Sequence, residues 1–515
     1  MPARWARATH ASRRQRARRR IGRHCAFSIT CQSAVIGCRG AGRGNRSDRR
    51  RGLSAAGHIS HRLHARAALL PGGWARNVTI DIDDAGAIVS AQRDASDTNA
   101  ELLAGPAIPA MPNVHSHAFQ RALAGRTGRA ARSRDDSFWT WREAMYAFLR
   151  RVDADVFGAI AAQAYLEMAK AGYATVGEFH YVHHDAEGKA YADPAELAWR
   201  IVAAAEEVGL GLTLLPVFYA HAGFGGAEIT DKQRRFAHSV DSYARLIATL
   251  SAAGPERRFV IGIAPHSVRA VTPDELAEII RLGPANAPLH IHAAEQTKEV
   301  DECVAWSSMR PVDWLLKHAN IDRRWCVVHA THMTDDETNA LAQSGAVAGL
   351  APTTEADLGD GTFPAERYVA SGGALGVGSD SNTFIDPFAE LRQLEWSQRL
   401  HLHRRNVLGG DESTVGISLW ARAAHGGAQA LAQKTGAIAK GYRADLVVLN
   451  GGDAALAHQE VDNILDAAIF GPCRQPVRDV MSSGVWIVRD GHHAREAEIF
   501  ARYRAALRSL DHGPT

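Results

Sequence analysis

Residues 288–295 read PLHIHAAE, a short apolar run that ends at His292 and is followed three residues later by Glu295. Similar runs that end at a histidine or an aspartate recur along the chain: MPNVHSH (111–117), FVIGIAPH (259–266), WCVVHATH (325–332) and ALGVGSD (374–380). In parallel β/α barrels, active-site residues come from the ends of several different strands. The pattern therefore predicts a barrel with one catalytic metal at its mouth, which is typical of a hydrolytic enzyme.

Outward from residue 288, apolar runs of strand character alternate with helical patterns. Eight such runs are present, at 107–114, 174–180, 211–219, 259–265, 288–293, 325–330, 346–352 and 374–379. Helical patterns fill the gaps between them, for example at 155–171, 194–208, 273–282 and 334–344. Eight β/α alternations predict an α/β fold of the (β/α)8, or TIM-barrel, type.

The two ends of the folded chain have a different pattern. Residues 77–92 (NVTIDIDDAGAIVSAQ) alternate apolar and polar side chains around a DDAG turn, which indicates a hairpin, and residues 444–450 and 485–488 also have strand character. We expect both ends to pair into one small β-sandwich domain. The expected organisation is a first part of this domain at 61–108, the metal-dependent hydrolase barrel at 109–425, the second part of the β-domain at 426–505 and a tail at 506–515.

The formal net charge of +3 hides an Arg-rich start. Residues 1–60 hold 15 arginines, no lysine and one acidic residue, whereas the rest of the chain holds 44 basic and 55 acidic residues. One interpretation is a nucleic-acid-binding arm or an organelle address. The other, which we favour, is a disordered extension, either native or translated from upstream of the natural start, and nucleic acid is then not an expected partner.

The composition limits the classes of protein to which the chain can belong. With 46% hydrophobic and 22% charged residues, the chain resembles a soluble globular protein. No run of 18 apolar residues is present, so no membrane span is expected. The six cysteines have no C-x-x-C spacing, which favours free thiols and a reducing compartment, the cytoplasm.

Four of the polar strand ends suit one metal ion. Alternate residues of a strand face the same side, so His115 and His117 are expected to point together into the barrel mouth. His292 and Asp380 end two later runs. Three histidines and one aspartate suit Zn²⁺ or another divalent ion, and they leave a position for water, as a catalytic site requires.

Two further residues suit proton transfer. Glu295 is expected in the loop above the metal, where a carboxylate can carry protons. His329 ends the next run and can act as a second base or as a partner of an oxyanion. Either residue taken alone is equally well explained as a hydrogen-bonded polar residue at the start of a loop.

Longer stretches carry a resemblance to a known family. They are MPNVHSHAFQRALAGRT (111–127), FWTWRE (138–143), GEFHYVHH (177–184), APHSVRAV (264–271), HIHAAEQTKEVDEC (290–303), HATHM (329–333), TTEADLGDGTFPA (353–365) and GAIAKGYRADLVVLN (436–450). In these residues the chain resembles the amidohydrolase superfamily and, within it, the formimidoylglutamate deiminases of histidine breakdown, over roughly residues 61–505.

The resemblance implies a role for each matching position. His115, His117, His292 and Asp380 would bind one Zn²⁺, Glu295 would carry protons, and His329 and Asp380 would act on the water. The remaining positions would contact a small-molecule substrate, N-formimino-L-glutamate: His266 at the reacting group, and Gln120, Arg142, Tyr181 and Arg269 at the glutamate portion. The resemblance also implies a cytoplasmic enzyme, and we expect a homodimer.

Two other functions compete with this interpretation. A deaminase of the same fold that acts on a purine or another aminated ring would need an aromatic and less cationic pocket, and Trp139 and Trp141 keep this alternative open. The segment that holds them is either a substrate lid or a packed loop. A barrel that has lost catalysis is the second alternative, and retention of every metal and proton-carrying residue argues against it.

Overall fold

The computed structural model describes residues 58–127, 137–257, 259–410 and 413–512. The predicted extension at 1–60 therefore lies outside the described residues except at its end, where the first strand begins at Ile59. The elements given below belong to one structural unit that starts at Gly57.

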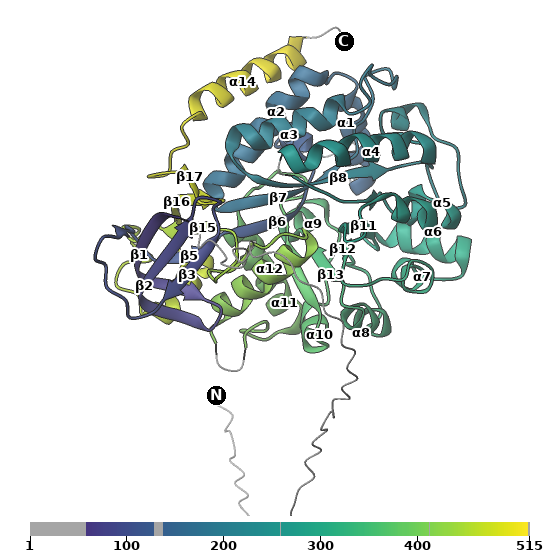
Figure 1. Cartoon of the computed structure of the whole chain (residues 1–515). Helices are drawn as coiled ribbons and strands as arrows, with labels where there is room; N and C mark the ends of the chain where they lie inside the picture. Colours follow the sequence, from purple (N-terminus) through teal and green to yellow (C-terminus); the bar gives the residue numbers. More distant parts are fainter. Residues whose placement is uncertain (1–57, 128–136, 258, 411–412, 513–515) are drawn as a thin grey trace, which may run out of the picture. The chain divides into compact units, whose positions relative to one another are not determined.

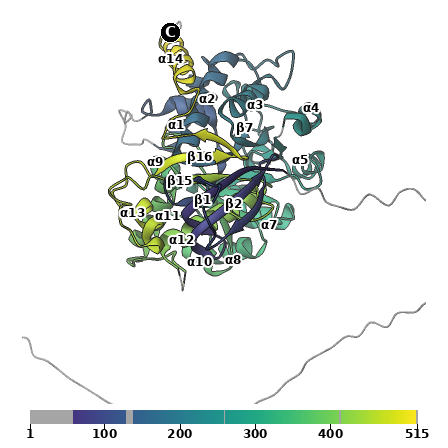
Figure 2. The ribbon, with the colours of Figure 1, turned by 60° about the vertical axis from the view of Figure 1, so that its left-hand side comes forward.

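Strands from both ends of the chain share one eight-stranded sheet, in the order β17-β16-β15-β5-β1-β2-β3, with β4 paired to β1. Figures 1 and 2 show the N-terminal strands beside those of the C-terminal part. The strands of this sheet are β1 (Ile59–Leu70), β2 (Gly73–Asp83), β3 (Ile88–Gln92), β4 (Glu101–Leu102), β5 (Ala107–Pro109), β15 (Leu446–Leu449), β16 (Val477–Ser482) and β17 (Val485–Val488). The predicted hairpin is confirmed by antiparallel pairing of β2 with β3, and β15 joins the two ends by pairing with β5.

The middle of the chain forms two parallel sheets, in the orders β10-β8-β7-β6, with β9 paired to β8, and β11-β12-β13-β14. The strands are β6 (Met111–Ser116), β7 (Tyr173–His180), β8 (Gly211–Phe218), β9 (Val260–Ile261), β10 (Ala264–Pro265), β11 (Leu289–Ala293), β12 (Trp325–His329), β13 (Val347–Leu350) and β14 (Ala374–Val377). Every one of the eight predicted runs thus contains a strand. Parallel bridges join the two sheets at both edges, from Ile263 to Leu289 and from Ser116 to Asp380.

Helices fill the connections between these strands. The α-helices are α1 (Phe138–Leu149), α2 (Ala154–Ala171), α3 (Glu196–Val208), α4 (Val240–Arg257), α5 (Pro273–Ile279), α6 (Thr297–Ser307), α7 (Pro311–His318), α8 (Asp335–Gln343), α9 (Pro352–Leu358), α10 (Ala365–Ala370), α11 (Pro387–Leu402), α12 (Val415–Ala430), α13 (Ile464–Phe470) and α14 (Glu496–His512). The 3-10 helices are η1 (Ala118–Leu123), η2 (Asp231–Phe236), η3 (Val268–Ala270), η4 (Ile280–Leu282) and η5 (Val461–Asn463). Helices α5 and α8 begin with acidic residues in their first turns, and Thr272 and Thr334 each cap the helix by accepting a backbone N–H.

Two of the expected boundaries differ from the structure. The boundary between residues 425 and 426 falls inside α12, which packs against β14 and β6. The expected tail at 506–515 begins inside α14, a helix that continues to His512 and packs along α2. Ile499 and Leu510 are buried on this helix, and Glu496 pairs with Lys170 of α2. Residues 506–512 are therefore part of a packed helix and not a tail.

Two expectations from composition are also settled for the described residues. Among them, no helix combines the length and the apolar character needed to cross a bilayer. Cys303, Cys326 and Cys473 are free thiols, as the sequence predicts for this part of the chain.

Contact between α12 and β14 depends on a glycine. A Cβ atom at Gly426 would lie 2.0 Å from the backbone oxygen of Leu375. Gly426→Ala gains about 1 kcal/mol of helix propensity, but the clash with a backbone atom outweighs it. We expect a loss of about 1–3 kcal/mol or more in the free energy of unfolding, measured by urea denaturation. Gly451→Ala, where the nearest atom is 3.8 Å from the added Cβ, is the control; equal stability of both variants would contradict this packing.

Candidate active site

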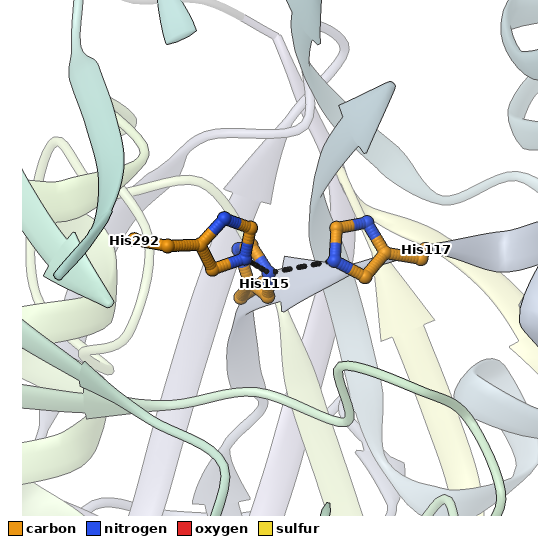
Figure 3. Close-up of side chains that lie close together, drawn as sticks. All are labelled: His115, His117 and His292. Atoms are coloured by element: carbon orange, nitrogen blue, oxygen red, sulfur yellow. Dashed lines mark hydrogen bonds between the residues drawn. The ribbon is translucent and has the colours of Figure 1, made fainter. Parts of the chain in front are cut away.

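Three buried histidines from two parallel sheets point at one another. His115 lies in β6, His117 directly follows it, and His292 lies in β11. The Nε2 atom of His115 is 3.2 Å from that of His117 and 3.1 Å from that of His292 (Figure 3). Neighbouring strand ends thus bring together residues that are up to 177 positions apart in the sequence.

Backbone carbonyls fix which nitrogen of two imidazoles carries the proton. The Nδ1 atom of His117 lies 3.0 Å from the oxygen of Phe179, and the Nδ1 atom of His292 lies 3.0 Å from the oxygen of His266. Because a carbonyl only accepts, each Nδ1 is the donor, and a neutral ring then carries a lone pair on Nε2. Both lone pairs are therefore directed at the centre of the cluster, as in metal-binding histidines.

Asp380 completes the cluster from the end of the chain's last parallel strand. Its Oδ1 atom is 3.3 Å from Nε2 of His117 and 3.6 Å from Nε2 of His115. Backbone hydrogen bonds hold it there, because Asp380 donates to His115 and His117 donates to Asp380, both at 2.9 Å. All four residues predicted as ligands thus converge.

Burial sets the charges of this cluster. Desolvation lowers the pKa of His115 and His292 well below the usual value and lowers that of His117 to about 3, so these rings are neutral. Burial also raises the pKa of Asp380 to about 7, against the effect of His329. Neutral imidazoles with facing lone pairs and a carboxylate fit a divalent cation, which would satisfy all of them.

Glu295 and His329 lie beside this cluster. The Nε2 atom of His329 is 3.7 Å from Oε1 of Glu295 and 3.7 Å from Oδ2 of Asp380. Burial alone would lower the pKa of His329, but Glu295, a hydrogen bond with Glu355 and the charge of Asp380 together raise it well above its usual value. The site therefore holds a protonatable imidazole between carboxylates, next to the three neutral ones.

Two buried acids near this pair have no role predicted from the sequence. Glu355 of α9 lies 3.3 Å from Nδ1 of His329. Asp360, two residues beyond the end of α9, forms a group with Glu295 and His329 in which the candidate ligand atoms lie within 4.8 Å of one another. Burial, with the charge of Glu295, raises the pKa of Asp360 to about 9. Both acids lie in TTEADLGDGTFPA. This stretch contributes to the family resemblance, but it does not end an apolar run, so the strand-end pattern could not identify either acid.

A cavity opens next to the cluster. It is lined by every predicted site residue except His115: His117, Gln120, Arg142, Tyr181, His266, Arg269, His292, Glu295, His329 and Asp380. Gln120 donates a hydrogen bond of 2.8 Å to the Tyr181 hydroxyl, and its own buried Oε1 has no partner among the described residues. The predicted residues therefore share one binding cavity.

Two arginines face this cavity without a carboxylate bound to their Nε atoms. The Nε atoms of Arg142 and Arg269 are buried and have no hydrogen-bond partner in the described part of the chain. Arg142 stacks on the rings of Trp139 and Tyr146, at 4.5 and 5.7 Å. Burial opposes the charge of Arg269, but Glu299 and other nearby groups raise its pKa, so it stays charged. Such groups are suited to bind carboxylates of a ligand.

The aromatic segment that contains Trp139 and Trp141 is helical in this structure and not a loop. It forms the start of helix α1, where Phe138 is buried. Phe138 and Trp141 line the cavity beside Arg142. The aromatic residues thus supply one wall of the cavity.

Comparison with known families matches most of the chain. The model described as "Amidohydrolase family" matches residues 107–487, and the model described as "Formimidoylglutamate deiminase HutF, N-terminal domain" matches residues 60–103. A formimidoylglutamate deiminase of Pseudomonas aeruginosa is 50% identical over 435 residues, which cover 84% of this chain and 96% of that protein. A 5-methylthioadenosine/S-adenosylhomocysteine deaminase of Halobacterium salinarum is 25% identical and covers 84% of this chain and 93% of its own length.

Solved structures give the same picture. An amidohydrolase from Brucella melitensis has a TM-score of 0.83 at 47% identity, covering 88% of this chain and all of that one. An adenosine deaminase from Xanthomonas campestris with bound zinc has a TM-score of 0.72 at 19% identity and covers 88% of this chain and 99% of its own. The second likeness concerns the fold alone.

Proposed function

Because the chain belongs to the amidohydrolase family and, within it, to the formimidoylglutamate deiminases, we propose that its cavity hydrolyses N-formimino-L-glutamate to N-formyl-L-glutamate and ammonia. This reaction belongs to histidine degradation. The observation that carries the assignment to this site is the shared cavity: two arginines without a partner for Nε lie in the same space as the cluster of three histidines and Asp380. A purine has no carboxylate for these arginines to bind.

The finer architecture is part of the proposal. The two parallel sheets would be one closed (β/α)8 barrel, because bridges connect them at both edges. The sheet built from both chain ends would be a small β-sandwich domain, with approximate parts at 61–108 and 426–505. The cavity would then lie at the carboxyl ends of the barrel strands, where such enzymes have their active sites.

We assign His115, His117, His292 and Asp380 as ligands of one Zn²⁺ ion. The converging Nε2 lone pairs and the Asp380 carboxylate support this choice. Zinc bound there would supply Lewis-acid activation of a water molecule, whose pKa it lowers to about 7. Other divalent metals remain compatible with the same donor set.

Different side chains around the cluster would carry out the separate proton transfers. Water attacks the formimino carbon, and His329 and Asp380 orient it and accept its first proton. Glu295 delivers protons to the nitrogen that leaves as ammonia, and as the carbon–nitrogen bond breaks the second proton of the water leaves the new hydroxyl for the same acid–base groups, which gives the formyl product. The 3.7 Å separations of His329 from Glu295 and from Asp380 support this division, because a bound substrate can draw such groups closer.

Other residues that line the cavity would bind the glutamate portion. Arg142 and Arg269 would bind its carboxylates, Gln120 and Tyr181 would complete the contacts, and His266 would contact the reacting group. The hydrogen bond between Gln120 and Tyr181 supports a prearranged contact. A cytoplasmic location and a homodimer remain predictions.

Substrate choice tests the function directly. Ammonia release is measured from N-formimino-L-glutamate, N-formimino-L-aspartate, guanine and adenosine with the metal-loaded chain. We expect N-formimino-L-glutamate to have the highest kcat/KM and the two purines to release no ammonia, because only the amino-acid derivatives carry two carboxylates. Faster release from adenosine or guanine would favour a ring deaminase instead.

Glu295→Gln tests the proton carrier. An amide of the same shape cannot donate the proton to the leaving nitrogen, so we expect kcat to fall by about 10²–10⁴-fold. Metal analysis should still find one zinc per chain, because Glu295 is not among the four assigned ligands. The control is Glu302→Gln on the exposed face of α6, with wild-type kinetics expected. Near-normal turnover by Glu295→Gln would remove this residue from the mechanism.

Arg269→Ala tests the carboxylate contact. Loss of one charge-assisted hydrogen bond, about 1.5–3 kcal/mol, predicts a KM higher by roughly 10–100-fold, with a smaller change in kcat. Steady-state kinetics measure both constants. Arg257→Ala, which removes an exposed arginine paired with Glu206, should leave both unchanged. If KM of the Arg269 variant equals that of the wild type, this side chain does not bind the substrate.

A further inference from the structure

His329 has an unusual backbone conformation for a residue assigned to proton transfer. It ends β12 with a φ of 66°, and Ala330 follows with a φ of 48°. Two consecutive non-glycine residues with positive φ are strained and persist only where the surroundings hold them. The orientation of the His329 ring therefore depends on its contacts.

One of those contacts comes from the helix after the next strand. Glu355 of α9 is buried, and its Oε1 atom lies 3.3 Å from Nδ1 of His329. The same oxygen accepts the backbone N–H of Ala351 at 3.0 Å, just before α9 begins. A donor on the main chain thus fixes the carboxylate that faces the histidine.

We propose that Glu355 is a positioning residue that sets the ring orientation of His329 and holds a proton on its Nδ1 atom. An ionised carboxylate only accepts hydrogen bonds, so Nδ1 of His329 must be the donor. The other nitrogen, Nε2, is then the one that faces Glu295 and Asp380 across the substrate cavity. This inference rests on the proposed function, because His329 receives its role there.

A second cavity lies behind this contact. Glu355, Gly359, Phe363, Leu394 and Leu400 line it together with other residues of the α9 and α11 segments. Leu400 is 78% exposed, so this rear cavity opens to solvent on the side of α9 away from the substrate. Glu355 does not line the substrate cavity, whereas His329 does. Removing the Glu355 side chain would open a path from the rear cavity to Nδ1 of His329 for a small carboxylate.

Three substitutions at this position separate geometry from charge. Glu355→Gln keeps an acceptor at the same place, because the Ala351 N–H requires the amide oxygen rather than its NH₂ group, and we expect kcat within about fivefold of the wild type. Glu355→Asp keeps the negative charge but moves it away from Nδ1 of His329. Glu355→Ala removes the charge and the hydrogen-bond acceptor. We expect these two variants to lose about 10–100-fold in kcat, as for other groups that orient an active-site histidine, with KM within threefold.

Chemical rescue gives a readout that a purely structural role would not move. Formate added at increasing concentration to Glu355→Ala should restore kcat at least fivefold, whereas chloride should not, and the wild type should not respond. Glu395→Gln is the matched control, since Glu395 is also buried but accepts the backbone N–H groups of Val407 and Leu408, outside the site. We expect wild-type kinetics from it and no effect of formate.

The outcomes decide between the alternatives. Wild-type kcat in Glu355→Asp, or an equal loss in the Gln and Ala variants without formate rescue, would overturn the positioning role. A crystal structure of Glu355→Ala tests the ring independently of turnover: we expect a rotated His329 ring, and an unchanged ring would contradict the proposal. Should the wild-type chain release no ammonia from N-formimino-L-glutamate, the proposed function fails, and this structure still decides whether Glu355 orients the ring.

Discussion

The convergence of three buried Nε2 atoms at 3.1–3.2 Å is the constraint on which the rest of the site depends. Two of these atoms carry lone pairs, because the Nδ1–H groups of His117 and His292 are donated to carbonyls of other segments. Facing lone pairs repel one another in a dry interior, and a divalent cation turns that repulsion into ligation. The oxygens of Phe179 and His266 thus orient the Nε2 atoms that would bind such a cation.

Parallel register brings these atoms to one level. Ala293 lies opposite His329 in the β11–β12 pair, and isolated bridges join Ser267 to His292 and Ser116 to Asp380. Each strand therefore ends beside its neighbour, and the first residues beyond the ends meet. The positive φ values of His329 and Asp380 turn the chain sharply at this point, which places their side chains against the histidine cluster.

The sequence predicts the part of this arrangement that is encoded locally. Short apolar runs that end at metal-binding side chains identify the strands and the four residues that converge, because a buried strand needs a continuous apolar segment. It does not identify β1, whose apolar residues are interrupted by Arg62 and His64 and whose state depends on pairing with β2 and β5. Glu355 was missed for a similar reason. An acid in the first turn of a helix is ordinary in sequence, and only tertiary packing places it against His329.

The cavity contains both acidic and cationic side chains, and their charges would orient a charged ligand. Glu295 and Asp380 line it, Asp360 lies close to Glu295, and the two arginines line the same cavity without a carboxylate on Nε. At an effective dielectric constant of 20, a carboxylate 4 Å from a guanidinium gains about 4 kcal/mol, and the same carboxylate 4 Å from an ionised acid loses a similar amount. A dicarboxylate with a basic formimino group would therefore be held in one direction, with its carboxylates at the arginines and its basic end at Glu295. The reversed arrangement would place like charges together, so the orientation that the proposed proton transfer requires is also the one that electrostatics would select.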